Sequence, residues 1–304
     1  MKGFLLMAAA GFLTTVSGLE VLRPTPLRCE PVKGETRTWD TRHFRIVSEV
    51  DLPEFDLHRL AVVADSTARA VGAHPIAWFD PPRHHRPELR IFRDAESYEN
   101  GGGAPGSAGS YVWGEAAVAL DAGHLFPPVD PQSRLRPMPD EATVVHEIVH
   151  LCMHGSQGQL SQWFSEGICE YYAAAHLGGG RFDFRDMDRQ IRRHVRRRFG
   201  DEVEVIPALP LDQIVGLDHR AWLRLMFRIP AEIRYHGYMS ALLLTHYHLH
   251  GTERRKALEE CFSARPVENP QSFDRLGDTT SDLEKSLAAY WRSRGLGISF
   301  EKGP

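Results

Sequence analysis

The sequence predicts an α+β fold, in which a small mixed sheet comes first along the chain and a group of helices follows. Strand candidates cluster in the first half of the chain and helix candidates in the second, a distribution that is typical of α+β domains. Apolar residues make up 42% of the 304 residues, which allows a substantial buried core and argues against global disorder. The length suits one large domain or two small ones.

Residues 1–18 are predicted to be a secretory signal peptide. Lys2 precedes an uncharged apolar run from Gly3 to Val16, and two small residues, Ser17-Gly18, follow it. The run is too short to span a bilayer comfortably, although an uncleaved membrane anchor or a buried helix is the alternative. We therefore expect an exported protein (periplasmic, extracellular or in the cell envelope). Membrane association is expected only through an uncleaved signal segment, and the oligomeric state is not predicted.

Residues 19–40 are rich in Pro, Thr and charge and are predicted to be a linker, so the folded domain is expected to span 41–295. Its first part, a sheet subdomain over 41–155, begins with alternating and apolar runs that predict strands and helices. The expected order is a strand over 43–48, a helix over 56–71, a strand over 89–92, a helix over 95–100, and two strands over 110–113 and 116–120. The short separation of the last two strands predicts a hairpin.

The second part of the chain has a helical pattern. Asp140 can cap a helix that runs to about Met153, and His154-Gly155 marks its end. A helical lobe over 156–295 is expected to contain helices at 160–177, 184–198, 219–228, 231–249, 253–263 and 281–293.

Charge gives no argument for nucleic-acid binding. The net charge is −4 with 16 His counted as neutral, so no basic surface is implied for the chain as a whole. The six Arg between Arg189 and Arg198 are expected to form a solvated helix face, as charge runs usually do.

The segment His146-Glu147-Ile148-Val149-His150 carries the clearest chemistry in the chain. Its two histidines stand four residues apart, so one helical turn places both imidazoles on the same face, about 6 Å apart along the axis. Two ligands of a single Zn²⁺ need that arrangement. Glu147 projects beside such a metal and could take a proton from a metal-bound water, which is the logic of zinc hydrolases.

A third protein ligand is expected from the next helix. A catalytic zinc needs three protein ligands and one open position. Glu166, within Trp163-Phe164-Ser165-Glu166-Gly167, would be brought to the metal if this helix runs antiparallel to the first.

The HExxH segment followed by Trp163-x-x-Glu166-Gly167 resembles the gluzincin metallopeptidases, and it is most similar to the bacterial peptidase-MA-like family of exported proteins. The metzincin pattern HExxHxxGxxH is not present, because Met153 stands where the pattern requires Gly and Ser156 stands where it requires His. The resemblance implies a zincin-like fold. In that fold a small mixed sheet packs on the HExxH helix, and a C-terminal helical lobe closes the other side of the cleft.

The resemblance also implies roles for individual residues. His146, His150 and Glu166 would be the ligands of one Zn²⁺, and Glu147 would be the general base and proton shuttle. Glu170, one turn after Glu166, would hydrogen-bond a ligand histidine and fix its orientation.

Two further features are implied around the metal. The strand near Ala108–Trp113 matches the edge strand that pairs with an extended peptide substrate. A Tyr or His usually stabilises the oxyanion of the tetrahedral intermediate. Tyr238 is the first choice for this role, and Tyr235 and His236 are the alternatives.

The four cysteines do not suggest a cysteine zinc site, because no CxxC spacing occurs. They are Cys29, Cys152, Cys169 and Cys261. Export would allow disulfides. Cys152 and Cys169 closely follow two expected ligands on helices that must approach each other, so a disulfide between them is predicted, with free buried thiols as the alternative.

The other histidines near these motifs are not expected to bind the metal. The helix rises about 12 Å from His146 to His154, so His154 is expected to lie at the rim or at the helix end. His84 and His85 fall in a Pro-rich loop and should be solvated, whereas His246, His248 and His250 alternate on a helix and are expected not to share a face. Trp163 is expected to be a packing residue.

Together these features predict a zinc-dependent peptidase that acts on a peptide or protein substrate. Two alternatives remain open: a zinc-binding envelope protein that is not a peptidase and has a vestigial site, and a zinc amidohydrolase with a non-peptide substrate. Cleavage specificity is not predicted, because loops form the pocket walls.

Overall fold

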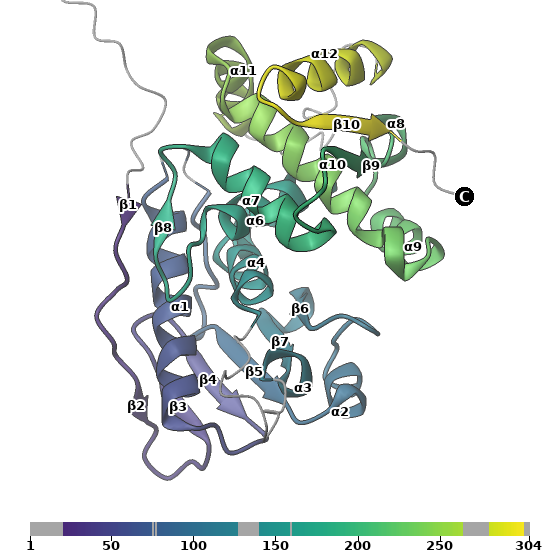
Figure 1. The fold of residues 1–304 in the computed structure, drawn as a ribbon. Helices are drawn as coiled ribbons and strands as arrows, with labels where there is room; N and C mark the ends of the chain where they lie inside the picture. Colours follow the sequence, from purple (N-terminus) through teal and green to yellow (C-terminus); the bar gives the residue numbers. More distant parts are fainter. Residues whose placement is uncertain are drawn as a thin grey trace, which may run out of the picture.

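The computed structural model describes residues 21–74, 76, 78–126, 140–158, 160–263 and 280–300. The protein is a mixed α+β structure, which confirms the predicted fold class at this level. A sheet with α1 forms one part of the molecule, a group of helices forms the other, and α4 and α6 lie between them (Figure 1).

The predicted signal peptide, 1–18, lies outside the described residues, and so do residues 127–139. Among the helices that are described, none combines the length and apolar character needed to cross a membrane.

The main sheet has six strands in the order β2-β3-β4-β5-β7-β6. Their bounds are β2 (Glu30–Pro31), β3 (Thr38–Asp40), β4 (Arg45–Ser48), β5 (Glu88–Phe92), β6 (Gly109–Val112) and β7 (Ala117–Asp121). β4, β5 and β7 run parallel, whereas β2, β3 and β6 pair antiparallel with their neighbours. The sheet is therefore mixed, as predicted. α1 (Glu54–Gly72) is the crossover between the parallel strands β4 and β5, as such a connection requires.

The predicted linker over 19–40 is wrong for its described residues, because they form β1 (Val21–Leu22), β2 and β3. Thr38 is buried and Trp39 packs against the core; because adjacent strand residues point to opposite faces, both faces of β3 are partly covered, which the Pro-rich composition did not reveal. The turn after β3 is fixed by the buried carboxylate of Asp65, which accepts hydrogen bonds from Thr41 Oγ1 at 2.8 Å and from the backbone N–H of Arg42 at 3.0 Å.

The predicted hairpin is confirmed and ends the sheet. β6 pairs antiparallel with β7, and a 3₁₀ turn over Trp113–Glu115 joins them. Tyr98 supports β6 through its hydroxyl, which lies 2.7 Å from Ser110 Oγ and 2.6 Å from Ser107 Oγ. β6 is an edge strand, so its outer side has no partner among the described strands.

The helices match the predicted ones within a few residues at each end. They are α2 (Ala95–Asn100), α4 (Glu141–Cys152), α6 (Gln162–Ala175), α7 (Met187–Phe199), α9 (His219–Arg228), α10 (Ala231–Leu249), α11 (Thr252–Ser263) and α12 (Thr280–Arg292).

Several short elements were not predicted. They are α3 (Ala122–Leu125), α5 (His154–Gln157), β8 (Phe182–Asp183), β9 (Val205–Ala208), α8 (Leu211–Ile214) and β10 (Gly297–Phe300). β8 pairs with β1, and β9 pairs in parallel with β10. These pairings join segments far apart in sequence, which local patterns do not reveal.

α6 is the central helix and packs against both α4 and α10. Gly167 makes the contact with α10 possible, since a Cβ at this position would lie 2.3 Å from the carbonyl oxygen of Ala241 and 2.1 Å from Thr245 Oγ1. No other residue fits without displacing α10. The glycine that follows Glu166 in the sequence motif therefore has a structural reason.

Two predictions about buried side chains are wrong. Cys152 and Cys169 are free thiols and do not form the predicted disulfide. His246 and His250, which were expected not to share a face, stack with ring centroids 4.0 Å apart, because residues four apart on a helix lie one turn apart. By contrast, His84 and His85 are exposed, as predicted.

His248 provides a test of this packing through the pH dependence of stability. Its side chain is buried, and burial, together with the charge of Arg254, lowers its pKa to about 4. An unfolded histidine titrates near pH 6.5. Between these values the unfolded chain binds a proton that the folded chain does not, so this residue lowers the free energy of unfolding as pH falls, by about 1.4 kcal/mol per pH unit.

We expect His248→Leu to make the decline in stability between pH 6.5 and pH 4.5 shallower, as measured by urea unfolding at a series of pH values. The matched control is His84→Leu, which removes an exposed histidine and should keep the wild-type pH dependence. Equal slopes for all three proteins would contradict the buried position of His248.

Candidate metal site

α4 supplies the first part of the site. The side chain of Asp140 accepts a hydrogen bond from the backbone N–H of Thr143 at 3.2 Å and so caps the start of the helix, as predicted. Two turns further on, His146 and His150 lie on one face, and their Nε2 atoms are 3.2 Å apart. Both side chains are buried, with 7% and 6% of their surface exposed.

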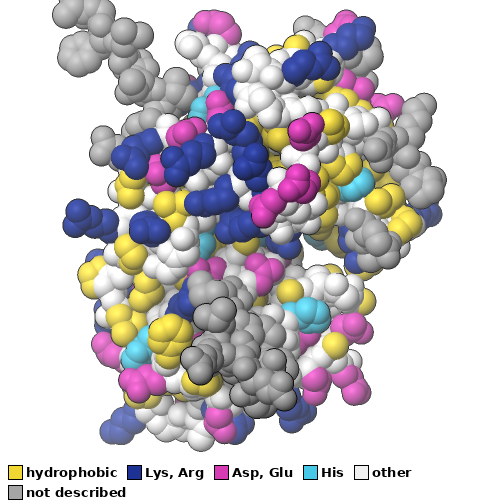
Figure 2. All heavy atoms as spheres, viewed as in Figure 1, with side chains coloured by type: hydrophobic (Ala, Val, Ile, Leu, Met, Phe, Trp, Pro, Cys, Tyr) yellow, Lys and Arg dark blue, Asp and Glu magenta, His cyan; other side chains and the backbone are white. Residues whose placement is uncertain are grey.

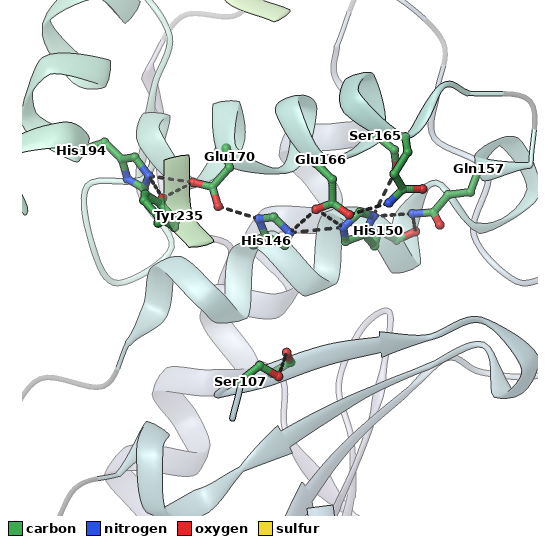
Figure 3. A network of polar contacts seen from close by, with 11 residues as sticks. Ser107, His146, His150, Gln157, Ser165, Glu166, Glu170, His194 and Tyr235 are labelled. Carbon is green, nitrogen blue, oxygen red and sulfur yellow. Dashed lines mark hydrogen bonds and ion pairs between the residues drawn. The ribbon is translucent and has the colours of Figure 1, made fainter. Parts of the chain in front are cut away.

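α6 supplies Glu166. Its Oε2 lies 3.2 Å from His146 Nε2 and 3.4 Å from His150 Nε2. The three predicted ligands are therefore brought together, with their donor atoms directed at one another (Figure 3).

Cys169, which the sequence analysis did not place at the metal site, also lies beside His146 and His150. His146, His150 and Cys169 form a buried group that could hold a metal ion, with one ligand atom from each residue within 4.8 Å of the others. Cys169 stands three residues after Glu166, so both lie on the same face of α6. That spacing was the signal in the sequence that could have found it.

Glu166 and Cys169 differ in their charge. Burial alone would raise the pKa of Glu166, but the charge of His150 and hydrogen bonds with both histidines bring the pKa well below its ordinary value. Burial raises the pKa of the Cys169 thiol well above its ordinary value, and the nearby carboxylates add to this effect. Glu166 is thus the ionised donor at neutral pH, and Cys169 is a neutral thiol.

Glu170 lies behind His146, as the resemblance implied. Its Oε1 is 3.0 Å from His146 Nδ1. Its other oxygen, Oε2, accepts a hydrogen bond from the Tyr235 hydroxyl at 2.6 Å and lies 2.8 Å from His194 Nε2. Burial would raise the pKa of Glu170, but its hydrogen bonds with the two histidines hold the pKa well below the usual range.

The arrangement at Glu170 sets the tautomer of His146. A carboxylate beside Nδ1 favours a proton on that nitrogen, so in the neutral imidazole the lone pair of Nε2 is directed toward Glu166 and His150. This is the orientation that a metal ligand needs.

His194 is a residue of the site that the sequence analysis missed. It lies in the Arg-rich segment that was expected to be a solvated face. In fact α7 has two sides: Ile191 and His194 are buried, whereas Arg196 and Arg197 are exposed. The buried histidine interrupts the run of arginines, and that interruption was the only local sign of it.

The other two predicted ligands, His150 and Glu166, also contact polar side chains on the side that faces away from the other donor atoms. The side-chain amide of Gln157 lies 2.5 Å from His150 Nδ1, and Ser165 Oγ lies 3.4 Å from the same atom. Gln162 Nε2 donates to Glu166 Oε1 at 2.6 Å. Each of the three predicted ligands is therefore held in place by neighbouring side chains.

Glu147 stands outside this cluster of donors and faces β6. The backbone of Tyr111 in β6 acts on its carboxylate and favours the ionised form. β6 approaches closely here, since a Cβ on Gly109 would lie 3.1 Å from Glu147 Cγ. Burial raises the pKa of Glu147, and the two histidines of the site oppose this shift only in part.

The three candidates for the oxyanion role occupy different places. The ring of Tyr238 lies 6.0 Å from the ring of His146, between centroids. Tyr235 is bound to Glu170 instead, and His236 is buried beside Phe199. Of the three, Tyr238 is the one whose ring contacts His146, a predicted metal ligand.

His154 and Trp163, which were not expected to bind the metal, lie where they were predicted. His154 begins α5, just beyond the end of α4, and its Nδ1 is hydrogen-bonded by the Tyr111 hydroxyl. Trp163 is buried and packs at an angle against Phe164.

Comparison with known proteins does not identify a relative. None of the models of known protein families matches the chain, and no curated protein matches it.

A metal-binding comparison distinguishes the two candidate third donors. Purified protein dialysed against a divalent metal ion should retain about one ion per chain. We expect Glu166→Gln to weaken metal affinity at least tenfold, because it removes the ionised donor, and we expect Cys169→Ser to retain affinity close to that of the wild type. His154→Ala is the control and should bind normally. Loss of binding in Cys169→Ser with retention in Glu166→Gln would make Cys169 the third donor.

Proposed function

We propose that this protein is a zinc-dependent peptidase, in which His146, His150 and Glu166 hold one Zn²⁺ and Glu147 is the general base. The observation that carries the proposal is the mutual arrangement of the three donor atoms, with Glu147 outside the group and facing the edge strand.

The donor set fits zinc in number, type and spacing. Two imidazoles and one carboxylate form a catalytic zinc site that keeps a fourth position open. Bond lengths of about 2.0–2.1 Å in a tetrahedral arrangement separate neighbouring ligand atoms by about 3.3 Å. The separations in this protein are 3.2 Å between the two Nε2 atoms, and 3.2 Å and 3.4 Å from them to Glu166 Oε2.

When bound, zinc supplies Lewis acidity, which polarises a carbonyl group and lowers the pKa of a coordinated water to about 7. Glu147 takes the proton from the attacking water with its carboxylate and delivers it to the nitrogen of the leaving amine. Its raised pKa suits a group that must both accept and release a proton near neutral pH. The close approach of β6, where a Cβ on Gly109 would lie 3.1 Å from Glu147 Cγ, limits the movement of this side chain during both transfers.

Tyr238 is proposed to donate a hydrogen bond to the oxyanion that develops on the substrate carbonyl. Burial and the charges of Glu166 and Glu147 raise the pKa of its hydroxyl well above the ordinary value, so the hydroxyl keeps the proton that it must donate. Glu170 orients His146 through its contact with Nδ1. His194 and Tyr235 in turn hold the carboxylate of Glu170.

β6 gives the reason for preferring a peptide as the substrate. Its outer edge has no partner among the described strands, and it passes directly over Glu147 through Gly109 and Tyr111. An extended peptide that adds to this edge by backbone hydrogen bonds would lie alongside the general base.

Replacement of Glu147 tests the chemistry directly. We expect Glu147→Gln to bind zinc as the wild type does and to lose about 10²–10⁴-fold in peptide hydrolysis, measured with zinc-loaded protein on a broad peptide library. Retained activity would exclude Glu147 as the base. If the zinc-loaded wild type cleaves no peptide, the peptidase proposal fails, and a non-peptidase role or a non-peptide amide substrate becomes the better explanation.

Two tyrosines provide a matched test of the oxyanion role. Tyr238→Phe should lower kcat by about 10²–10³-fold with little change in KM or zinc affinity. Tyr235→Phe removes a hydrogen bond to Glu170, so it should weaken zinc affinity by about tenfold and recover most activity at saturating zinc. Wild-type kcat in Tyr238→Phe would remove this residue from the mechanism.

A further inference from the structure

A cavity of about 530 Å³ lies beside the metal group. It forms where the end of β6, the connection from α5 to α6 and the loop before α9 meet, and the hollow between the two parts of the molecule is seen on the right of Figure 2. Gln157 and Gln162 line this cavity and also contact His150 and Glu166. The cavity therefore adjoins the donor group.

The free surface of the cavity is mainly apolar. Gln157 and Gln162 are engaged by the metal group, and Asp218 caps α9 by accepting a hydrogen bond from the backbone N–H of Ala221 at 2.7 Å. What remains toward the space is the indole of Trp113 and the side chains of Leu160 and Leu217, with the exposed His219 and Arg220 on the side of α9. Trp113 is 47% exposed, so its indole is accessible to a ligand that enters the cavity.

Trp113 has a fixed position although it is exposed. Its ring lies 5.3 Å from the ring of His154 and 6.3 Å, nearly perpendicular, from that of Tyr111. Tyr111 is in turn hydrogen-bonded to His154 through its hydroxyl and lies parallel to the ring of His150, 5.9 Å away. These aromatic contacts connect the cavity wall to the metal group.

We propose that this cavity receives one large apolar or aromatic side chain of the substrate, and that Trp113 selects it. The proposal rests on the proposed peptidase function. A peptide strand paired with β6 would point its side chains alternately to the two sides of the sheet. β6 ends at Val112 and Trp113 follows immediately, so the peptide passes the cavity as it leaves the edge of the sheet.

Gly158 offers a way to fill the cavity without disturbing the metal group. Its φ is −64°, which any residue adopts, and a Cβ there would meet only the ring of Trp113, at 3.7 Å. Alanine therefore fits in ordinary contact. A leucine would extend into the space in front of Trp113.

The first test measures kcat/KM on peptides in which each position in turn carries Phe, Leu or Ala. We expect the wild type to prefer Phe or Leu over Ala at one position by at least about tenfold, as apolar pockets typically discriminate. Gly158→Leu should reduce this preference to about threefold or less while cleaving the Ala peptides normally, which also shows that it folds. Gly158→Ala is the matched control and should keep the preference.

If Gly158→Leu does not fold, Leu217→Gln is the second variant and should lower the same preference, because it places a polar amide on the cavity wall. Cleavage with no preference at any position, or a preference that neither variant changes, would overturn the proposal while leaving the peptidase function intact.

If the wild type cleaves no peptide, the proposed peptidase function fails. A binding measurement then tests whether the cavity accepts an aromatic side chain. The probe is N-acetyl-phenylalanine amide, and the signal is the indole N–H of Trp113 in NMR spectra, assigned with Trp113→Phe. The probe should shift this signal in the wild type and in Gly158→Ala but not in Gly158→Leu, whereas N-acetyl-alanine amide should not shift it. The absence of any shift in the wild type would overturn the proposal.

Discussion

The burial of several carboxylates in one place is the constraint on which the rest of this structure depends. Glu147, Glu166 and Glu170 are all nearly excluded from solvent, and they lie around the imidazoles of His146 and His150. An uncompensated buried charge is very costly, so such a cluster persists only with positive charge among it. Protons on the histidines can supply that charge, and so can a metal ion.

Without a metal ion, His146 is the side chain on which this compensation falls. Burial would lower the pKa of this imidazole, but the hydrogen bonds to Glu166 and Glu170 and the nearby carboxylate charges raise it well above its ordinary value. A cationic imidazole here occupies the centre of a negatively charged cage. A divalent cation held by the neutral nitrogens would serve the same electrostatic need, and it would do so with ligand spacings that suit zinc.

The scaffold brings the cage together by close packing. Gly167 lets α10 approach α6 without a side chain between them, so α10 can present Tyr235 to Glu170 and Tyr238 to His146. On the opposite side Gly109 lets β6 approach α4 closely at Glu147. The site is thus set between an edge strand and a helical lobe, with the apolar cavity at one end.

Much of this could be predicted from sequence because the signals are local. The spacing of His146 and His150 on an apolar-faced helix, and the carboxylate of Glu166 on the next helix, depend on only two elements and a short connection. The hairpin of β6 and β7 was likewise predictable from two short runs separated by a glycine turn. Each of these features needs no knowledge of distant contacts.

The features that could not be predicted depend on contacts between distant segments. His194 contacts Glu170 across 24 positions in the chain, and the interruption of the arginine run at this histidine does not indicate which residue it contacts. The strands β1 to β3 were not predicted because they are short and lie among Pro and charged residues, although Thr38 is buried and Trp39 packs against the core. The expected Cys152–Cys169 bond is not formed for a related reason: the proximity of two helices does not set the direction of each thiol, and Cys169 instead lies within 4.8 Å of the ligand atoms of His146 and His150.

The central claim is that two imidazoles and the Glu166 carboxylate hold zinc, and X-ray absorption at the zinc edge of the zinc-loaded protein tests it most directly. Nitrogen and oxygen ligands alone, at about 2.0–2.2 Å and including two imidazoles, are the result that this account predicts. A sulfur ligand at about 2.3 Å would make Cys169 the third ligand in place of Glu166, and failure to bind zinc at all would contradict the account entirely.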